Sequence, residues 1–482
     1  MTATSTALND CWRMPLAMIG RVNTIIFPAK GPLIISTFPA FFTFTDIPDT
    51  IFRCKNTTLF NRKIVIKQDM DNTKQNTNST TSVSAMGRQL SAHTRYYTFL
   101  VGYLVCLSAL GSFVNDMYSP ALPAMVKFFH CSVPTGQMGL TMGMTGLGLG
   151  QIILGPVSDH YGRRPVLMVS LSLFIVSAIV SVFSPTIHTF NLCRLFQGMG
   201  ASGGYFLART IPADVYSGRP LARLMALIGA INGIAPASAP VIGGVTADQW
   251  GWKGVFVVLA VFAAIILALS PGLKESLAES KRSSGSILRS FGGYRHLLGN
   301  YRFMVHVCFK GAALGLLFAY ISSAPFILQT HYGLSQTSYG FVIGFNSLFV
   351  VSGSMLALRF HPLKKAAVTG AGLLAAGVAA QAIALWHVHS LWLFEACMCV
   401  SLLGLGLIFS TTNTLAMNEG RQHAGEASAV LGVAGYAVGA VVSPLVGMGD
   451  ILHSTAIVFV ALTVITGVFA LLTRHIAPDL DT

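Results

Sequence analysis

Long apolar segments, separated by short polar breaks, follow one another along most of the chain from Tyr97 onward. A stretch of roughly 20 apolar residues is long enough to cross a bilayer as a helix. The pattern therefore predicts an all-α membrane protein with twelve transmembrane helices. The expected spans are 97–120, 134–157, 165–184, 189–212, 222–246, 252–273, 303–328, 337–358, 366–386, 390–416, 427–448 and 453–473.

The longest polar break divides these spans into two sets of six. The segment around Pro240 recurs around Pro444, and the basic pair Arg163–Arg164 has a weaker counterpart at Lys364–Lys365, at nearly the same spacing. Internal repeats are typical of transporters whose two halves enclose a site near the bilayer midplane. We expect two pseudo-symmetric six-helix bundles. The expected parts are a leader (1–96), a first bundle (97–273), a cytoplasmic linker (274–302), a second bundle (303–474) and a tail (475–482).

Lys and Arg favour one set of loops, which predicts that both termini are cytoplasmic. The leader differs from the rest of the chain. Its most apolar piece, 31–45, is too short to cross a bilayer and contains two prolines, and residues 53–95 are polar and typical of disorder. We expect the true start to be Met70 or Met86, with a genuine cytosolic tail as the alternative.

Composition supports a membrane location and argues against several other classes of function. Residues are 53% hydrophobic and 10% charged, whereas soluble proteins contain about 25% charged residues. The net charge of +14 does not indicate nucleic-acid binding, because the basic residues lie in loops and in the leader. The eight cysteines show no metal or disulfide spacing. We expect no metal, no cofactor and no enzymatic activity, and the absence of a phosphate-binding Gly-Lys-Ser/Thr loop excludes an ATP-driven pump as a single chain.

Ionisable residues inside the spans are the candidates for function, because a charge in the membrane is costly. Asp116 and Arg194 are the proton-coupling candidates: an acid that exchanges a proton, and an arginine that holds a carboxylate or tunes a nearby acid. The open alternatives are that Asp116 ends the first helix at the outer water boundary and that Arg194 reaches the outer interface. Arg209 is interpreted as a boundary charge and Lys310 as structural, and Glu395 is a secondary proton-site candidate.

Polar and aromatic residues on the spans predict an apolar pocket with a few hydrogen-bonding groups, the usual form of a site for amphipathic small molecules. Any one of them is as readily explained by packing or lipid contact. The absence of a dense basic set argues against phosphorylated substrates. The candidate substrate-binding residues are Asn115, Tyr118, Gln197, Tyr205, Asn232, Tyr320, Phe326, Asn346 and Phe349, with Asn413 beside them.

Two further segments are expected to act in conformational switching. The first is the turn between the second and third spans, with Gly155, Asp159, Gly162, Arg163 and Arg164. The second is the end of the fifth span, a helix rich in Gly and Pro, with Pro240, Gly243 and Gly244. Small residues permit close helix contact, and proline bends a helix.

The order Gly-x-x-x-Asp-x-x-Gly-Arg-Arg at 155–164 resembles the signature loop of the major facilitator superfamily. Residues 97–474 resemble its twelve-span drug:proton antiporters, and among them the Bcr/CflA-type multidrug efflux group. The residues on which this resemblance rests are 115–123, 155–164, 194–198 and 240–244. One position departs from the antiporter motif, because Ala239 stands where the motif has Gly. The resemblance implies that the acid at Asp116 is protonated during transport, that Arg194 lies in the central cavity and that Asp159 helps to lock the outward-open state.

These observations predict a proton-coupled antiporter that exports small amphipathic drugs or toxic compounds across the bacterial inner membrane by alternating access. The alternative is a proton-coupled importer of a small nutrient or metabolite on the same fold. The expected partners are a drug-like small molecule, protons and the lipid bilayer, without nucleic acid, and a monomer is expected.

Overall fold

The computed structural model describes residues 80–282, 292–384, 390–421 and 424–476. From Gly87 onward these residues belong to one unit. The leader up to residue 79, with the expected start at Met70, lies outside the described residues, as do 283–291 of the linker and 477–482 of the tail.

The described elements are helices, which satisfy their own backbone hydrogen bonds and so suit a lipid environment. The first half contains α2 (Thr80–Asp116), η3 (Ser119–Ala121), α3 (Leu122–Phe128), α4 (Val133–Tyr161), α5 (Arg163–Val182), α6 (Ile187–Val215), α7 (Gly218–Leu269) and the short turns η4 (Ser270–Gly272) and η5 (Glu279–Lys281). The second half contains α8 (Gly292–Gly299), α9 (Tyr301–Pro325), η7 (Phe326–His331), α10 (Gln336–Leu356), η8 (Ala357–Arg359), α11 (Leu363–Ile383), α12 (Leu391–Glu419), α13 (Ala424–Leu445) and α14 (Ile451–Ile476).

Side-chain caps set where several of these helices begin. The Ser132 hydroxyl accepts a hydrogen bond from the Thr135 backbone N–H at the start of α4. Thr186, Asn300 and Ser335 cap α6, α9 and α10 in the same way. Each oxygen satisfies a backbone donor that has no partner within the first helical turn.

The expected count of twelve spans is confirmed. Ten helical stretches are long and apolar enough to cross a membrane. One of them contains α7, which is two helices joined at Gly251, where φ is 69°; that left-handed conformation favours glycine. The two arms of α7 correspond to the expected spans 222–246 and 252–273. The remaining span is α6, which is not among the ten and whose hydropathy is lowered by Arg194, Gln197 and Arg209.

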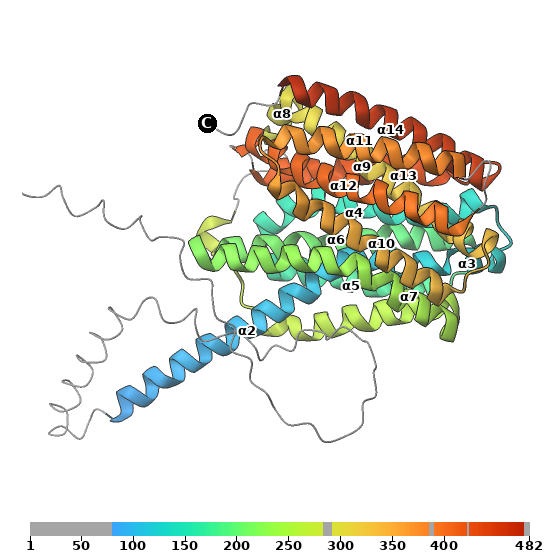
Figure 1. The fold of residues 1–482 in the computed structure, drawn as a ribbon. Helices are drawn as coiled ribbons and strands as arrows, with labels where there is room; N and C mark the ends of the chain where they lie inside the picture. The colour runs from blue at the N-terminus through green and yellow to red at the C-terminus, as the bar shows by residue number, and fades with distance from the viewer. Residues whose placement is uncertain (1–79, 283–291, 385–389, 422–423, 477–482) are drawn as a thin grey trace, which may run out of the picture. The chain divides into compact units, whose positions relative to one another are not determined.

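The helices form two bundles that meet along two helix pairs. In the first bundle α4 and α5 pack on α6, and in the second α12 packs on α11 while α9 packs on α13 and α14. The bundles meet where α7 packs on α10 and where α4 packs on α13 (Figure 1). Glycines bring the backbones close: a Cβ added at Gly198 of α6 would lie 2.2 Å from the Gly143 carbonyl oxygen of α4.

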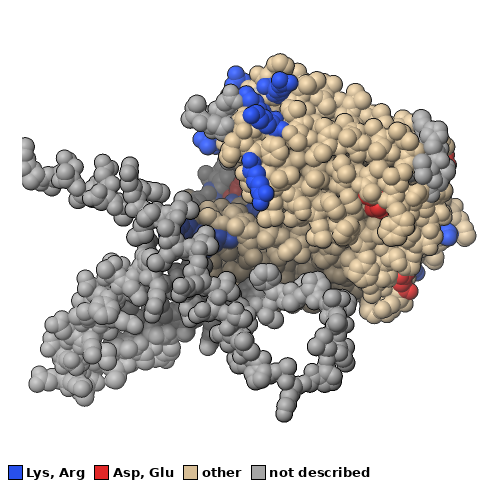
Figure 2. Space-filling model, viewed as in Figure 1, with Lys and Arg blue, Asp and Glu red and all other residues tan. Residues whose placement is uncertain are grey.

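Charge is distributed unevenly over the molecule. Figure 2 shows Lys and Arg gathered at one end, whereas the side of the bundles that faces the viewer is largely uncharged. We call this the basic end; it carries the Arg163–Arg164 turn, the start of α7 at Gly218 and the finish of α14 at Ile476. The opposite end, which we call the far end, carries η3, the Gly251 break and the start of α10.

Candidate functional site

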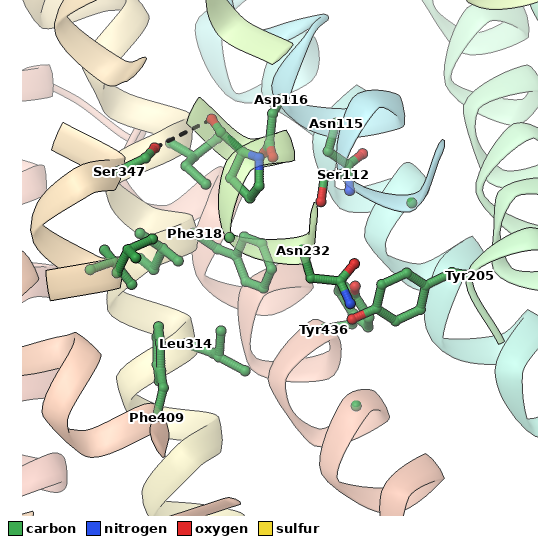
Figure 3. A pocket seen from close by; sticks show the side chains of 18 of the residues that line it. Ser112, Asn115, Asp116, Tyr205, Asn232, Leu314, Phe318, Ser347, Phe409 and Tyr436 are labelled. Atoms are coloured by element: carbon green, nitrogen blue, oxygen red, sulfur yellow. Dashed lines mark hydrogen bonds between the residues drawn. The ribbon is translucent and has the colours of Figure 1, made fainter. Parts of the chain in front are cut away.

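A cavity of about 630 Å³ lies between the two bundles. Its walls come from α2, η3, α4, α6 and α7 of the first bundle and from α9, α10, α12 and α13 of the second. Figure 3 shows the side chains of Asp116, Tyr205, Asn232 and Tyr436 around it, with Phe318 nearby. The volume is within the usual range for a small-molecule site.

The cavity is largely apolar, with polar groups contributed by both bundles. The polar and charged residues that line it are Ser112, Asn115, Asp116, Ser119, Gln151, Tyr205, Arg209 and Asn232 from the first bundle, and Lys310, Tyr320, Asn346, Ser347, Asn413, Ser428 and Tyr436 from the second. Such a surface can hold an apolar body and orient it through a few hydrogen bonds.

Asp116 is the last residue of α2 and lines the cavity. It is half-buried, and within the described residues its carboxylate accepts no hydrogen bond and forms no ion pair. Pro120 lies in η3 just beyond; its ring clashes with the carbonyl group four residues earlier, which is that of Asp116, and it has no N–H to donate there, so it favours a break at this point. The chain nevertheless continues as η3 and α3 to Phe128, so the membrane-spanning stretch extends past Asp116. The acid ends the helix inside the molecule.

Arg194 lies beside Asp116 but does not line the cavity. Its side chain is fully buried in the first bundle, where it donates to the Val114 carbonyl oxygen at 2.8 Å and to Asn115 Oδ1 at 2.9 Å. Further hydrogen bonds reach the Gly139 carbonyl oxygen and Gln197 Oε1. All four acceptors are neutral oxygens rather than carboxylates. Arg194 therefore fixes the backbone and side chain immediately before Asp116, away from the cavity in which the resemblance places it.

A second acid, Glu395, is linked to the cavity by a hydrogen bond from Asn346. Asn346 Nδ2, on α10, donates to Tyr320 OH and to Glu395 Oε2, each at 2.6 Å. Tyr320 and Asn346 line the cavity, whereas Glu395 lies behind them on α12. Its other oxygen, Oε1, is buried and has no hydrogen-bond partner among the described residues.

The two bundles are joined at the far end of the cavity. The Ser119 and Tyr339 hydroxyls are 2.7 Å apart, and Gln329 Nε2 donates to the Pro120 carbonyl oxygen at 2.9 Å. Asp248 Oδ2, on α7, accepts from the Thr337 backbone N–H at the start of α10, at 2.8 Å. These hydrogen bonds close the cavity beyond Asp116.

The turn between α4 and α5 is held by an ionic network that joins the first bundle to the start of the expected linker. Arg163 contacts Asp159 Oδ1 at 2.6 Å and Asp214 Oδ2 at 2.9 Å. The Glu275 carboxylate accepts from the backbone N–H groups of Arg163 and Arg164, at 2.9 and 3.0 Å. A carboxylate at this position stabilises the start of α5. Gly162, with φ 98°, provides the turn between the helices.

The structure brings together part of the predicted substrate-binding set. Asn115, Tyr205, Asn232, Tyr320, Asn346 and Asn413 line the cavity, as does Pro240 of the expected switch. Tyr118 and Gln197 are buried inside the first bundle, and Phe326 and Phe349 belong to the packed hydrophobic clusters. These four residues are not among those that line the cavity.

Arg209, Lys310 and Tyr436 line the cavity although sequence analysis assigned the first two other roles and omitted the third. Helical spacing was the available signal: Arg209 is four residues beyond Tyr205 and therefore on the same face of α6. Within the described residues, no group of three or more His, Cys, Asp and Glu side chains is placed to hold a metal ion.

Comparisons with known proteins agree with this architecture. The family model described as the Major Facilitator Superfamily matches residues 104–444. The chain is 34% identical over 376 residues to the uncharacterized MFS-type transporter YdgK of Bacillus subtilis (strain 168), covering 77% of this chain and 92% of the relative. It is 26% identical over 363 residues to the bicyclomycin resistance protein homolog of Haemophilus influenzae, covering 70% and 86% of the two chains.

A solved transporter structure has a similar fold. The chain resembles a bacterial homolog of the human lysosomal transporter Spinster, in an inward-facing and occupied conformation, with a TM-score of 0.63. The two chains are 14% identical, and the match covers 79% of this chain and 97% of the other.

Proposed function

Because the chain belongs to the Major Facilitator Superfamily, whose members are transporters, we propose that it exports small amphipathic compounds in exchange for protons. The basic end is cytoplasmic in this proposal, since Lys and Arg concentrate in cytoplasmic loops. The membrane is the bacterial inner membrane, as suggested by the bacterial relatives.

Two observations favour export, and a third favours a drug-like substrate. The relatives include a bicyclomycin resistance protein homolog and several multidrug resistance proteins. The segment 239–244 resembles the antiporter motif, and its glycines lie in close contacts at the far end of the bundles. The cavity is of the size and polarity that suit a drug-like molecule.

The observation that carries the proposal is the unpaired carboxyl of Asp116 in a cavity shared by both bundles. A carboxylate without a partner inside a membrane protein is costly, and protonation removes that cost. With Asp116 deprotonated, the cavity takes up the compound from the basic end. A proton arriving from the far end neutralises Asp116 after the compound has left, and the empty carrier returns.

For the cavity to open at the far end, the hydrogen bonds that close that end must break while the basic end closes. Ser119, which bonds to Tyr339, follows Asp116 by three residues, so a change of charge at Asp116 acts next to the contact that closes the far end. The ionic network around Arg163 keeps α4, α5 and α6 together as the bundles rotate. We propose Asp159 and Arg163 as parts of the switch for this reason.

Replacing Asp116 by asparagine tests the proposal. In proteoliposomes, Asp116→Asn is expected to abolish drug flux driven by a pH gradient, because an amide cannot exchange a proton, and to leave drug binding in place. The control is Asp450→Asn, an exposed acid outside the cavity, which should transport as the unaltered protein does. Unchanged coupled flux in Asp116→Asn would remove Asp116 from the mechanism, and accumulation of the drug with protons would identify an importer.

A further inference from the structure

Two cations face the cavity from opposite bundles. Arg209 extends from α6 of the first bundle and Lys310 from α9 of the second, and both side chains are half-buried. Each lies about two turns inside the basic end of its helix, since α6 finishes at Val215 and α9 begins at Tyr301. An anion that enters from the basic end meets both of them.

The hydrogen-bond partners of these cations are neutral. Arg209 Nη2 donates to Tyr205 OH at 2.5 Å, and its guanidinium lies 4.3 Å from the centre of the same ring. Lys310 Nζ donates to Asn413 Oδ1 at 3.0 Å. Within the described residues, neither cation forms an ion pair. Charged side chains inside membrane proteins normally pair with one another or with backbone carbonyl groups. The hydrogen bonds of Arg209 and Lys310 to neutral side chains leave both positive charges without a counter-ion among the described residues.

The described residues that line the cavity place no acid beside these cations. Asp116 is the acid among the described lining residues, and it lies at the end of α2 next to the far-end closure. Arg209 is fifteen positions beyond Arg194 along α6, which corresponds to about 22 Å at 1.5 Å per residue. Arg194 itself bonds to Asn115, beside Asp116. The two cations therefore lie nearer the basic end of the cavity than the acid does.

Apolar side chains also line the cavity beyond the cations. Leu314 and Phe318 follow Lys310 at intervals of four residues on α9 and so lie on the same face. Ile228 of α7 lines the cavity as well. A ligand that matches this surface has an acidic group at one end and an apolar body directed towards Asp116.

We propose that the cavity binds small amphipathic organic anions, whose acidic group is held jointly by Arg209 and Lys310. This inference rests on the proposed function, because it takes the cavity to be the substrate site. A carboxylate or sulfonate held by one cation from each bundle also draws the two bundles together at the basic end. Binding of the anion thus favours the closure that must precede release at the far end.

Equilibrium binding to the purified full chain, at constant pH and without a gradient, tests the inference. Three fluorescent probes share a ring system and differ in charge: naphthalene-1-acetate, naphthalene-1-acetamide and naphthalene-1-methylamine. The acetate is expected to bind at least about tenfold more tightly than the other two, as buried charge pairs contribute that much or more. Arg209→Gln and Lys310→Gln should each weaken acetate binding by about tenfold or more, with acetamide binding unchanged.

Variants separate loss of charge from loss of folding. Arg223→Gln and Lys365→Gln remove exposed cations at the basic end and should leave acetate binding unchanged. Lys310→Arg keeps the charge and should retain most of the affinity. The inference is overturned if the acetate fails to bind, if the acetamide binds as tightly, or if the Arg209→Gln, Lys310→Gln double variant binds the acetate normally. Acetate binding without proton-coupled flux would instead overturn antiport and leave the anion site standing.

Discussion

At the scale of single residues, the buried arginine of α6 determines how the acid of α2 is presented. Arg194 bonds to the Val114 carbonyl oxygen and to Asn115 Oδ1, the two residues before Asp116. Its guanidinium also lies 4.7 Å from the centre of the Tyr118 ring. An arginine holds several acceptors in a fixed geometry because its planar fork presents five donors. Arg194 is therefore a positioning residue for Asp116.

Gly143 of α4 provides the space for this arrangement. A Cβ at this position would lie 2.6 Å from Asn115 Oδ1 and 2.8 Å from Arg194 Nη2. Gly143→Ala is expected to destabilise the protein by about 1–3 kcal/mol, the usual cost of overpacking, and to reduce proton-coupled flux. Thermal unfolding of the purified protein and flux in proteoliposomes measure both effects.

Gly102→Ala is the matched control, since a Cβ at that exposed position of α2 meets nothing within 4 Å. It should unfold within about 0.5 kcal/mol of the unaltered protein. Normal stability and normal coupling in Gly143→Ala would show that the contact between Arg194 and Asn115 is not needed.

The sequence singled out Asp116 as a candidate but did not place Arg209 and Lys310 in the cavity, and the reason is physical. An acid within a span has few explanations, so its presence alone indicates function. Arg209 and Lys310 were judged by their distance from the membrane edge, which permits a long side chain to reach water. Which face of the helix they occupy decides their role, and that depends on how the bundles pack.

At the scale of helices, α7 is the element that joins the two bundles at the far end. A Cβ at Gly243 would lie 2.0 Å from the Met117 carbonyl oxygen of the first bundle. A Cβ at Gly244, the next residue, would lie 2.3 Å from the Gln336 carbonyl oxygen at the start of α10. Adjacent positions of one helix thus touch both sides of the closure.

Enlarging Gly244 is expected to open the far end, because a methyl group there cannot fit against the α10 backbone. Gly244→Ala should shift the population towards a form open at that end. A cysteine introduced at Ile343, which lines the cavity from α10, reports the change through its rate of labelling by a membrane-impermeant maleimide.

Labelling of Ile343→Cys should become several-fold faster in the Gly244→Ala background. Gly229→Ala, on the same helix at a position where a Cβ meets nothing within 4 Å, should leave the rate unchanged. Equal labelling rates in the two backgrounds would contradict a sealing role for Gly244.

Helices were largely predictable from hydrophobic length, whereas their interruptions were not. The expected start of the second span at 134 is close to the observed start at Val133. Whether Asp116 ends the first helix was left open, since the expected first span continues to residue 120. In the structure the helix ends at Asp116, and the chain then continues through η3 into α3. The choice depends on contacts such as that between Ser119 and Tyr339, which no local pattern reveals.

At the scale of the whole molecule, the two bundles enclose a cavity that is closed at the far end. The internal repeat around Pro240 and Pro444 predicted two related bundles, and the fold agrees. The assignment of 97–273 and 303–474 as separate domains stays a prediction. The sequence alone could not predict which residues line the cavity together, because its walls come from helices that are far apart in the chain.

The pair of cations has an electrical consequence. If an organic monoanion leaves the cell for each proton that enters, every cycle moves two elementary charges, whereas exchange of a neutral compound moves one. At 100 mV these correspond to about 4.6 and about 2.3 kcal/mol of driving energy. Currents recorded on a solid-supported membrane should therefore carry about twice as much charge per molecule for naphthalene-1-acetate as for naphthalene-1-acetamide. A resting cell that holds its interior negative would then expel acids through this carrier by voltage alone, even when the pH on the two sides is the same.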